Sequence, residues 1–436
     1  MNTSSHIISS RTASSRIASF LRLLSLTVIW LAGETTLSAF QPKRYHLDVL
    51  AMNNGLPSNF VDDIYQDSYG FVWVCSRAGG LVRYDGYTFD YFDSRQWGGN
   101  LLRSHSCKNV VEDNYHRLWI AFDDYTGVLS LDAMEEQQPP CATPALTRRL
   151  RQALREGGIR TYKDGVGNIW VATIGHLYRL SFDTSGTVSA IAAMPYRLNA
   201  PDVALYDVGG KGNVWLGYNT SIAQLSVQGG RVVAHNRNAC FAPIVGSIFA
   251  IIPYQGHLWL GTFSGIYIND AGKTHLSHGM SPMSLSHNLV TSFAVGADHE
   301  LLIGTLGGMN VYDPRSHRIE HYGMSSADLP LTSDFVNCFL VSQGQIWIGT
   351  ESGGINKLSP RLLSLVNYVH SPVDAGSISP NCVNAMYAQP DGTLWVGTVE
   401  GGLNRKAPGS DVFTHYTTAN SALPHNSVSS LTADHV

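Results

Sequence analysis

Short apolar runs alternate with turns rich in glycine and aspartate along almost the whole chain. One kind of run recurs with tryptophan as its second residue, and seven of the nine tryptophans occupy this place. The copies are Val72-Trp73-Val74, Leu118-Trp119-Ile120, Ile169-Trp170-Val171, Val214-Trp215-Leu216, Leu258-Trp259-Leu260, Ile346-Trp347-Ile348 and Leu394-Trp395-Val396. An eighth copy carries Leu302 in the tryptophan position. Short runs that are apolar at consecutive positions are typical of strands buried on both faces.

The spacing of these runs predicts the architecture. Successive copies are 46, 51, 45, 44, 43, 45 and 48 residues apart. Such a period, with several short strands in each unit, is typical of a β-propeller blade. Each repeat holds three apolar runs and a weaker fourth, such as 89–92 or 413–416, and an Asp-x-x-Gly or Asp-Gly turn separates the first two. We therefore expect an all-β protein of four-stranded blades, with glycine supplying the positive φ of the turns.

We interpret the tryptophans as packing residues of the blade core. They are Trp73, Trp119, Trp170, Trp215, Trp259, Trp347 and Trp395. The residue two positions later faces the same side of the strand and is usually Gly or Ala, which leaves room for a bulky residue of the next blade. Cys75 takes this position in the first repeat, so we expect it to be a small buried residue. The six cysteines show neither a C-x-x-C motif nor metal-ligand spacing.

The start of the repeat array predicts how the ring closes. Residues 45–50 form a lone apolar run ahead of the first repeat. We expect them to be the outermost strand of a blade whose other strands come from the seventh repeat, around 335–358, because the ring would otherwise keep an open edge. The run near 365–369 would then be left for a second propeller. The alternative is an eight-bladed ring in which 45–50 pairs with the strand near Leu403.

This reading divides the chain into three parts. Residues 1–39 are expected to be a signal peptide, because arginines border an apolar run at 23–32 that is short for a membrane span. A retained anchor is the alternative. The repeats fill residues 40–360 and continue over 361–436, which are the other two parts. The chain would then be exported to the periplasmic or extracellular side of the inner membrane, as the front part of a longer protein.

The repeat resembles a known family, the two-component regulator propeller. The resemblance rests on Asn-Gly-Leu-Pro-Ser-Asn at 54–59, on Trp-Ile-Gly-Thr at 347–350 followed by two glycines, and on Trp-Val-Gly-Thr at 395–398 followed by Gly-Gly-Leu. It spans roughly residues 44–436, although Ala121, Ala172 and Tyr218 depart from the pattern. It implies the periplasmic sensor region of a Bacteroidetes hybrid two-component system, which senses glycan fragments and controls polysaccharide-utilisation genes.

The same resemblance implies parts beyond this chain. Members usually carry two seven-bladed propellers, an immunoglobulin-like domain, a membrane span, a histidine kinase, a receiver and an AraC-type DNA-binding domain. The resemblance therefore implies a seven-bladed ring over residues 40–360, and the first blade and opening strand of a second, incomplete propeller over 361–436. Some relatives have a diguanylate cyclase as the output instead. The partners implied are an oligosaccharide ligand and the remainder of a sensor kinase, and a homodimer is compatible with this arrangement.

Composition and motifs narrow the other function classes. The net charge is −4 and charged residues make up 14% of the chain, so no basic excess is available to hold nucleic acid. The sequence has no G-x-S-x-G, H-E-x-x-H or P-loop motif. We therefore expect no cofactor, no metal and no enzymatic activity. Two alternatives remain: a secreted scaffold that binds a protein partner, and a propeller lyase or glycosidase with carboxylates around the axis.

Candidate ligand-binding residues follow from propeller geometry. The connections from strand four to strand one, and the loops between strands two and three, lie on the same face. The second set contributes Arg77, Asp123, Asp124, Tyr125, His176, Tyr218, Asn219, Phe263 and Glu351. Aromatic rings beside hydrogen-bonding groups suit sugars. The alternative is that these are ordinary solvated loop residues.

One insertion on this face predicts a helix at 145–156. Thr143 suits the N-cap, Pro144 the first helical position, and Gly157 the C-terminal end. Arg148 and Arg151 are candidate ligands for an anionic glycan, because a guanidinium group pairs with a carboxylate or sulfate through two hydrogen bonds. The alternative is a packing helix with a solvated outer face.

Overall fold

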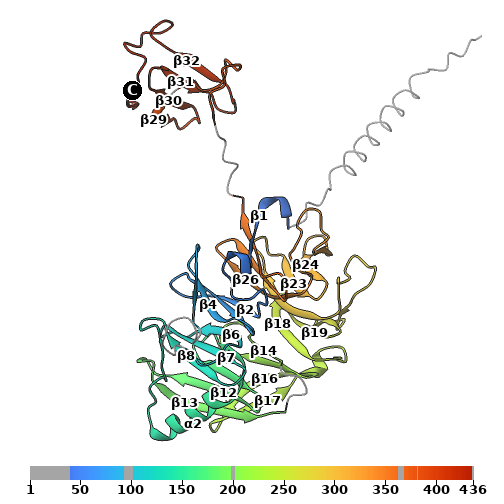
Figure 1. The fold of residues 1–436 in the computed structure, drawn as a ribbon. Helices are drawn as coiled ribbons and strands as arrows, with labels where there is room; N and C mark the ends of the chain where they lie inside the picture. The colour runs from blue at the N-terminus through green and yellow to red at the C-terminus, as the bar shows by residue number, and fades with distance from the viewer. Residues whose placement is uncertain (1–39, 93–101, 198–201, 362–367, 381, 435–436) are drawn as a thin grey trace, which may run out of the picture. The chain divides into compact units, whose positions relative to one another are not determined.

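The computed structural model describes residues 40–92, 102–197, 202–361, 368–380 and 382–434 (Figure 1). These residues form two units, and the first ends at Arg361. The architecture is nearly all-β and is built of four-stranded blades, as the repeats predict. The expected signal peptide at 1–39 lies outside the described residues.

The first unit contains seven blades within the described ranges, each of four antiparallel strands. The outer strands of blades 3 and 4 also pair in parallel, with Ala193 opposite Arg231, so these two blades form one eight-stranded sheet. Blade 1 consists of β2 (Asp63–Gln66), β3 (Val72–Ser76), β4 (Gly80–Tyr84) and β5 (Phe89–Tyr91). Blade 2 consists of β6 (Cys107–Glu112), β7 (Arg117–Phe122), β8 (Thr126–Ser130) and β9 (Glu135–Glu136). Blade 3 consists of β10 (Gly158–Lys163), β11 (Ile169–Thr173), β12 (His176–Phe182) and β13 (Val188–Pro195). Blade 4 consists of β14 (Val203–Asp207), β15 (Val214–Tyr218), β16 (Ser221–Gln228) and β17 (Arg231–Asn236).

The remaining blades of the ring follow the same order. Blade 5 consists of β18 (Ile248–Tyr254), β19 (His257–Thr262), β20 (Gly265–Ile268) and β21 (His275–Leu276). Blade 6 consists of β22 (Val290–Val295), β23 (Leu301–Thr305), β24 (Gly308–Asp313) and β25 (Arg318–Tyr322). Blade 7 consists of β26 (Val336–Ser342), β27 (Gln345–Thr350), β28 (Ile355–Pro360) and β1 (Tyr45–Leu50). Short 3₁₀ turns lie at Pro42–Arg44, Met52–Asn54 and Asn238–Cys240.

The N-terminal strand closes the ring. β1 pairs with β28 in antiparallel register from Tyr45 opposite Pro360 to Leu50 opposite Ile355. The first strands of the blades contact one another all the way round, and β26 lies against β2. The side-chain amide of Asn337 donates to the carbonyl of Val61 across this junction, at 3.0 Å. This is the pairing of a seven-repeat ring and not that of the eight-bladed alternative.

The second unit contains one blade in the described residues. Its strands are β29 (Val383–Ala388), β30 (Leu394–Thr398), β31 (Leu403–Lys406) and β32 (Phe413–Tyr416). The run near 365–369, expected as a left-over strand, lies mostly outside the described residues, and no strand covers 368–369. Val383 and Met386 on the first strand are 46% and 69% exposed, as expected of a blade that lacks a neighbour.

Most of the repeated tryptophans are core residues, as expected. Trp73, Trp119, Trp170, Trp259 and Trp347 are buried. Trp215 and Trp395 are only half-buried, so the expectation of a uniform tryptophan core is wrong for these two. The turn before Trp215 is longer than its counterparts, and the blade of Trp395 lacks a ring around it in the described residues.

Small residues two positions after the tryptophans receive the next blade, as the sequence predicts. A Cβ atom added to Gly217 would lie 2.6 Å from Cγ2 of Ile248, which begins the next blade. A Cβ atom on Gly349 would lie 2.8 Å from Cγ1 of Val61, so the same contact closes the ring. Cys75 is fully buried in the equivalent position of blade 1, in a cluster that includes the first residue of blade 2.

The insertion forms α2 (Pro144–Arg155), whose N-cap Thr143 accepts a hydrogen bond from the Leu146 amide at 3.3 Å. Leu150 and Ala153 are buried against blades 2 and 3. The expected glycine C-cap is wrong, because Glu156 ends the helix in an extended conformation. Gly157 serves a close approach instead, since a Cβ atom there would lie 2.3 Å from the carbonyl oxygen of Asp123.

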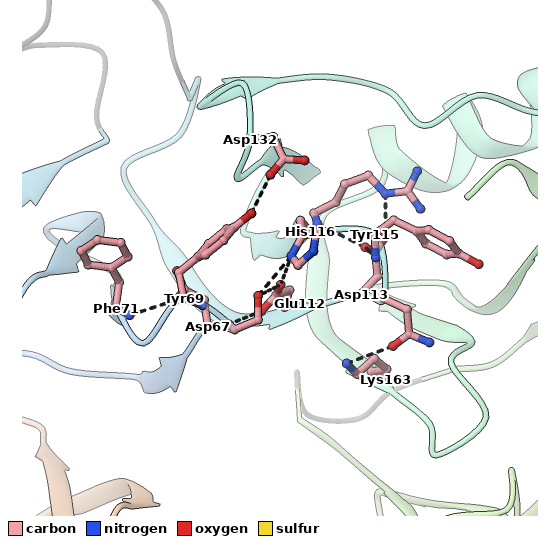
Figure 2. A network of polar contacts seen from close by, with 12 residues as sticks. Asp67, Tyr69, Phe71, Glu112, Asp113, Tyr115, His116, Asp132 and Lys163 are labelled. Carbon is pink, nitrogen blue, oxygen red and sulfur yellow. Dashed lines mark hydrogen bonds and ion pairs between the residues drawn. The ribbon is translucent and has the colours of Figure 1, made fainter. Parts of the chain in front are cut away.

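A polar network joins the hairpin turns of neighbouring blades (Figure 2). The Ser68 hydroxyl of blade 1 donates to Glu112 of blade 2 at 2.7 Å, and Nδ1 of His116 lies 3.2 Å from the same carboxylate. The Tyr69 hydroxyl donates to Asp132 at 2.7 Å. Every group in this network has a partner, so we interpret it as bracing between blades. We call this side of the ring, which carries the turns between strands one and two, the turn face.

Candidate ligand-binding face

The opposite side of the ring carries the loops that the sequence analysis singled out. In each of three blades, the residue after strand two donates its amide to the residue just before strand one. These bonds join Ile174 to Gly157 at 3.2 Å, Phe263 to Ser247 at 3.1 Å and Glu351 to Phe335 at 3.0 Å. The two sets of connections therefore lie together, and we call this side the loop face.

Charged side chains gather on the loop face where the first strands of blades 1 to 4 begin. Nε of Arg77 lies 2.8 Å from Oδ1 of Asp62. Nζ of Lys108 lies 2.6 Å from Oδ1 of Asp123 and donates to the carbonyl of Gly158 at 3.1 Å. Arg160 interacts electrostatically with both Asp63 and Asp202, and this links the two ion pairs to their neighbours. The charged cluster consists of Asp62, Asp63, Arg77, Lys108, Asp123, Arg160 and Asp202.

Several carboxyl groups of the charged cluster have shifted pKa values. Burial raises the pKa of Asp62 to about 6, although Arg77 favours its charged form. Burial also raises the pKa of Asp63 to about 6, against the opposing charge of Arg160. The pKa of Asp202 is raised by burial as well. Carboxyl groups with raised pKa values beside cations are enriched at functional sites.

Asp123 behaves in the opposite way. Burial would raise its pKa, but hydrogen bonds from Lys108 and Ser106 outweigh this effect and lower it. Its carboxylate therefore stays charged and holds Lys108 in place. The charged cluster thus combines a fixed ion pair with carboxyl groups that change protonation near pH 6.

Sequence reasoning identified only Arg77 and Asp123 of this cluster. It missed the other five members, which lie within or just before first strands: Asp62, Asp63, Lys108, Arg160 and Asp202. The available signal was a charged residue within or beside an otherwise apolar run. That signal was not used because the runs were interpreted as packing strands.

The loop face is apolar over other blades. Phe263, at the end of strand two in blade 5, is 60% exposed, and Val245 nearby is 62% exposed. Phe335 in blade 7 is 41% exposed. Exposed aromatic and aliphatic groups opposite a charged cluster give the face both kinds of contact that a saccharide uses.

The other predicted residues are distributed around the face. Nδ1 of His176 lies 3.1 Å from Glu156, so His176 anchors the end of α2. Tyr218 packs 6.0 Å from the ring of Tyr196. Asn219 has a φ of 48°, and its side-chain amide donates to the backbone carbonyl of Arg197 at 3.1 Å. These three have structural roles.

A second group of predicted residues surrounds α2. Asp124, Tyr125 and Arg151 line a groove between blade 2 and α2, and Arg148 lies beside it on the exposed side of the helix. Glu351 is half-buried in its loop and joins neither group. The predicted residues therefore form two candidate sites instead of one.

The described ranges hold no cluster of three or more His, Cys, Asp or Glu side chains placed to bind a metal ion. In the same ranges, no helix combines the length and apolar character needed to cross a bilayer.

Comparison with known proteins identifies the repeat. The two-component regulator propeller model matches residues 55–78 and 377–400, which confirms the resemblance at these two repeats. The first match lies in blade 1 and the second in the blade of the second unit. No protein of curated function matches the chain significantly.

Solved structures with the same fold include two from B. thetaiotaomicron. One is the extracellular domain of the hybrid two-component system BT3049, with 20% identity, a TM-score of 0.55, and coverage of 88% of this chain and 50% of that one. The other is the extracellular domain of the one-component system BT4673, with 19% identity, a TM-score of 0.52, and coverage of 90% and 50%. The chain thus spans about half the length of these two structures.

Proposed function

We propose that this chain, which carries two-component regulator propeller repeats, is the periplasmic ligand-sensing region of a hybrid two-component sensor. In this proposal, the loop face of its seven-bladed ring binds oligosaccharide fragments. The kinase and output domains of the sensor would be supplied by other parts of the full protein.

The charged cluster is the observation that carries the proposal. A blade needs apolar first strands for packing, and ionisable groups at their ends reduce the stability of the ring when they are buried. Asp62 and Asp63 reduce the stability of the ring at neutral pH, since burial raises the pKa of each to about 6. Such an arrangement is expected where the groups contact a ligand.

The comparisons support the proposal through the repeat and the fold. The family of the matched repeats is named for two-component regulators. Both similar structures are extracellular domains of signalling systems. A sensor of this kind must bind its signal without consuming it, and a rigid ring with loops on one face suits that task.

A propeller lyase or glycosidase is the second candidate function. The specific observation in its favour is again the pair Asp62 and Asp63, because a carboxyl group with a pKa of about 6 can act as a general acid near neutral pH. A sensor and an enzyme differ in whether the bound saccharide is cleaved.

Isothermal titration of the chain with neutral and acidic oligosaccharides tests the proposal, with chromatography of the recovered ligand. We expect saturable binding of at least one saccharide, recovered intact. We expect Lys108→Ala to weaken the binding of that saccharide or of a charged analogue. The substitution removes a cation from the charged cluster, together with its ion pair to Asp123. Cleaved products would favour the enzyme, and a complete absence of saccharide binding would contradict the proposal.

A further inference from the structure

A groove lies between α2 and the outer strands of blade 2, apart from the charged cluster. Its volume is about 490 Å³, within the range of small-ligand sites. β8, the residues after β9, and α2 form its walls. Its lining includes Arg103, Tyr125, Thr126, Glu136, Arg151 and Arg155.

The helical wall of this groove is held firmly in place. Glu156, which follows α2, accepts hydrogen bonds from the hydroxyls of Thr173 at 2.6 Å and Tyr178 at 2.9 Å. Leu150 and Ala153 are fully buried beneath the helix. The side chains that α2 presents to the groove therefore start from a fixed backbone.

The groove has more guanidinium groups than carboxylates to pair with them. Nε of Arg103 lies 3.9 Å from Oε2 of Glu136, at the limit of an ion pair. Nε of Arg151 donates only to the side-chain oxygen of Gln138, at 3.3 Å. Arg155 has no hydrogen bond or ion pair with any described residue. Two guanidinium groups on one helix are thus free to bind an anion through paired hydrogen bonds.

One buried hydroxyl in the lining has no partner. Thr126 is 2% exposed, and its Oγ1 forms no hydrogen bond within the described part of the chain. An unpaired buried polar group is costly, so in native proteins it indicates a missing partner. The amide side chains of Gln137 and Gln138 lie in the same lining. These groups match the hydroxyls of a polyhydroxylated ligand.

The ring of Tyr125 adds a flat surface to the groove. It stacks on Phe122 with 4.9 Å between centroids, and its hydroxyl accepts a hydrogen bond from the Arg103 amide at 3.1 Å. The guanidinium carbon of Arg103 lies 5.9 Å from the centroid of the same ring, so Tyr125 also positions a third guanidinium group beside the groove.

We propose that this groove binds a carboxylate-bearing saccharide, with the acid group on Arg151 and Arg155 and hydroxyls on Thr126 and the two glutamines. This inference rests on the proposed function, because it names the ligand class of a second site on the same ring. A neutral sugar would leave the two guanidinium groups unpaired. A simple anion would leave the hydroxyl and amides without partners.

Titration of the full chain with trigalacturonate tests the inference, and galactotriose, which lacks the carboxylates, is the matched ligand. Trigalacturonate is expected to bind at least tenfold tighter than galactotriose. Arg151→Ala and Arg155→Ala are each expected to weaken trigalacturonate binding at least tenfold, and Thr126→Val about threefold. Arg149→Ala is the matched control, because Arg149 is exposed on the same helix but does not line the groove. It should change binding less than twofold.

The outcomes separate this inference from the proposed function. Equal binding of the two trisaccharides overturns the inference but leaves the proposed function in place. So does trigalacturonate binding that Lys108→Ala weakens while Arg151→Ala and Arg155→Ala do not. Loss of binding in Arg149→Ala as well would show a general charge effect and would also overturn the inference. Unchanged melting temperatures of the variants establish that each remains folded.

Discussion

At the scale of single residues, the turn aspartates and the blade tryptophans form one unit. The indole N–H of Trp73 donates to Asp67 at 2.7 Å, and that of Trp119 donates to Asp113 at 2.9 Å. The aspartate is always six residues before the tryptophan in these pairs. The other carboxylate oxygen of Asp67 accepts two backbone amides of the turn. One side chain therefore fixes both the turn and the core ring.

Blade 4 shows what happens when this spacing changes. Its turn is longer, and Trp215 lies eight residues after Asp207. The indole nitrogen of Trp215 and Oδ1 of Asp207 are both buried without a partner in the described residues. The sequence predicted the aspartate turn and the buried tryptophan separately. It did not predict the hydrogen bond between these two side chains, which depends on the number of residues between them.

Trp73→Phe should lower the free energy of unfolding by about 1.5–3 kcal/mol, because it removes a buried hydrogen bond to a charged group. Trp259→Phe is the matched control, since the indole nitrogen of Trp259 is buried without a partner in the described residues. It should cost less than about 1 kcal/mol, because it also removes an unsatisfied donor. Urea denaturation measures both, and equal losses would contradict the role of the bond.

Asp63→Asn should change the pH dependence of stability. Burial raises the pKa of Asp63 to about 6, so the folded chain keeps a proton that the unfolded chain releases near pH 4. This group's contribution to stability is present below pH 4 and is lost as the pH rises through 6. Between pH 4 and 7, the free energy of unfolding of Asp63→Asn should therefore rise by about 1–3 kcal/mol relative to that of the wild type.

The control for this prediction has the opposite sign. Hydrogen bonds from Ser185 and Thr187 lower the pKa of Asp183, so Asp183→Asn should lose stability relative to the wild type as the pH rises. Urea denaturation across the pH series gives both differences. A difference between Asp63→Asn and the wild type that is the same at every pH would contradict the raised pKa.

At the scale of elements, contacts between blades decide the ring. Glycines at the end of the second strand accept β-branched residues from the first strand of the next blade, as Gly261 does with Val290. The sequence predicted this fit from the residue two positions after each tryptophan. The sequence did not predict that the residues of the charged cluster would lie together on the loop face. Their grouping depends on the first strands of four blades meeting at one axis. Sequence reasoning also missed the end of α2, where Gly157 was assigned to a cap but serves a close backbone contact.

Gly349→Ala tests the ring-closing contact. The added Cβ atom would lie 2.4 Å from Sγ of Cys338 and 2.8 Å from Val61, so both side chains must move. We expect a loss of about 1–3 kcal/mol, as for other overpacked cores. Gly175→Ala is the matched control, since no atom lies within 4 Å of its added Cβ atom. Thermal unfolding measures both, and an equal response would contradict a tight closure.

At the scale of the whole molecule, the ring separates its two faces. The turn face is braced by hydrogen bonds between neighbouring blades, such as Tyr69 to Asp132 (Figure 2). The loop face carries the charged cluster, the exposed Phe263 and the groove beside α2. The repeat period was sufficient to predict four-stranded blades, and the lone apolar run at 45–50 predicted the closure by β1. The number of seven blades came chiefly from the resemblance to the two-component regulator propeller family. The sequence could not indicate which loops of the loop face form a binding site, because the side chains that contact each other come from different repeats.

Hydrogen–deuterium exchange of the chain, with and without a saturating oligosaccharide identified by titration, tests the central claim most directly. If the loop face binds the ligand, protection should appear in peptides that contain the starts of β2, β6 and β10 and the loops after β3 and β7. Peptides of the turn face, including 67–70 and 113–116, should exchange at unchanged rates. Protection confined to the turn face, or to residues 382–434, would contradict the account.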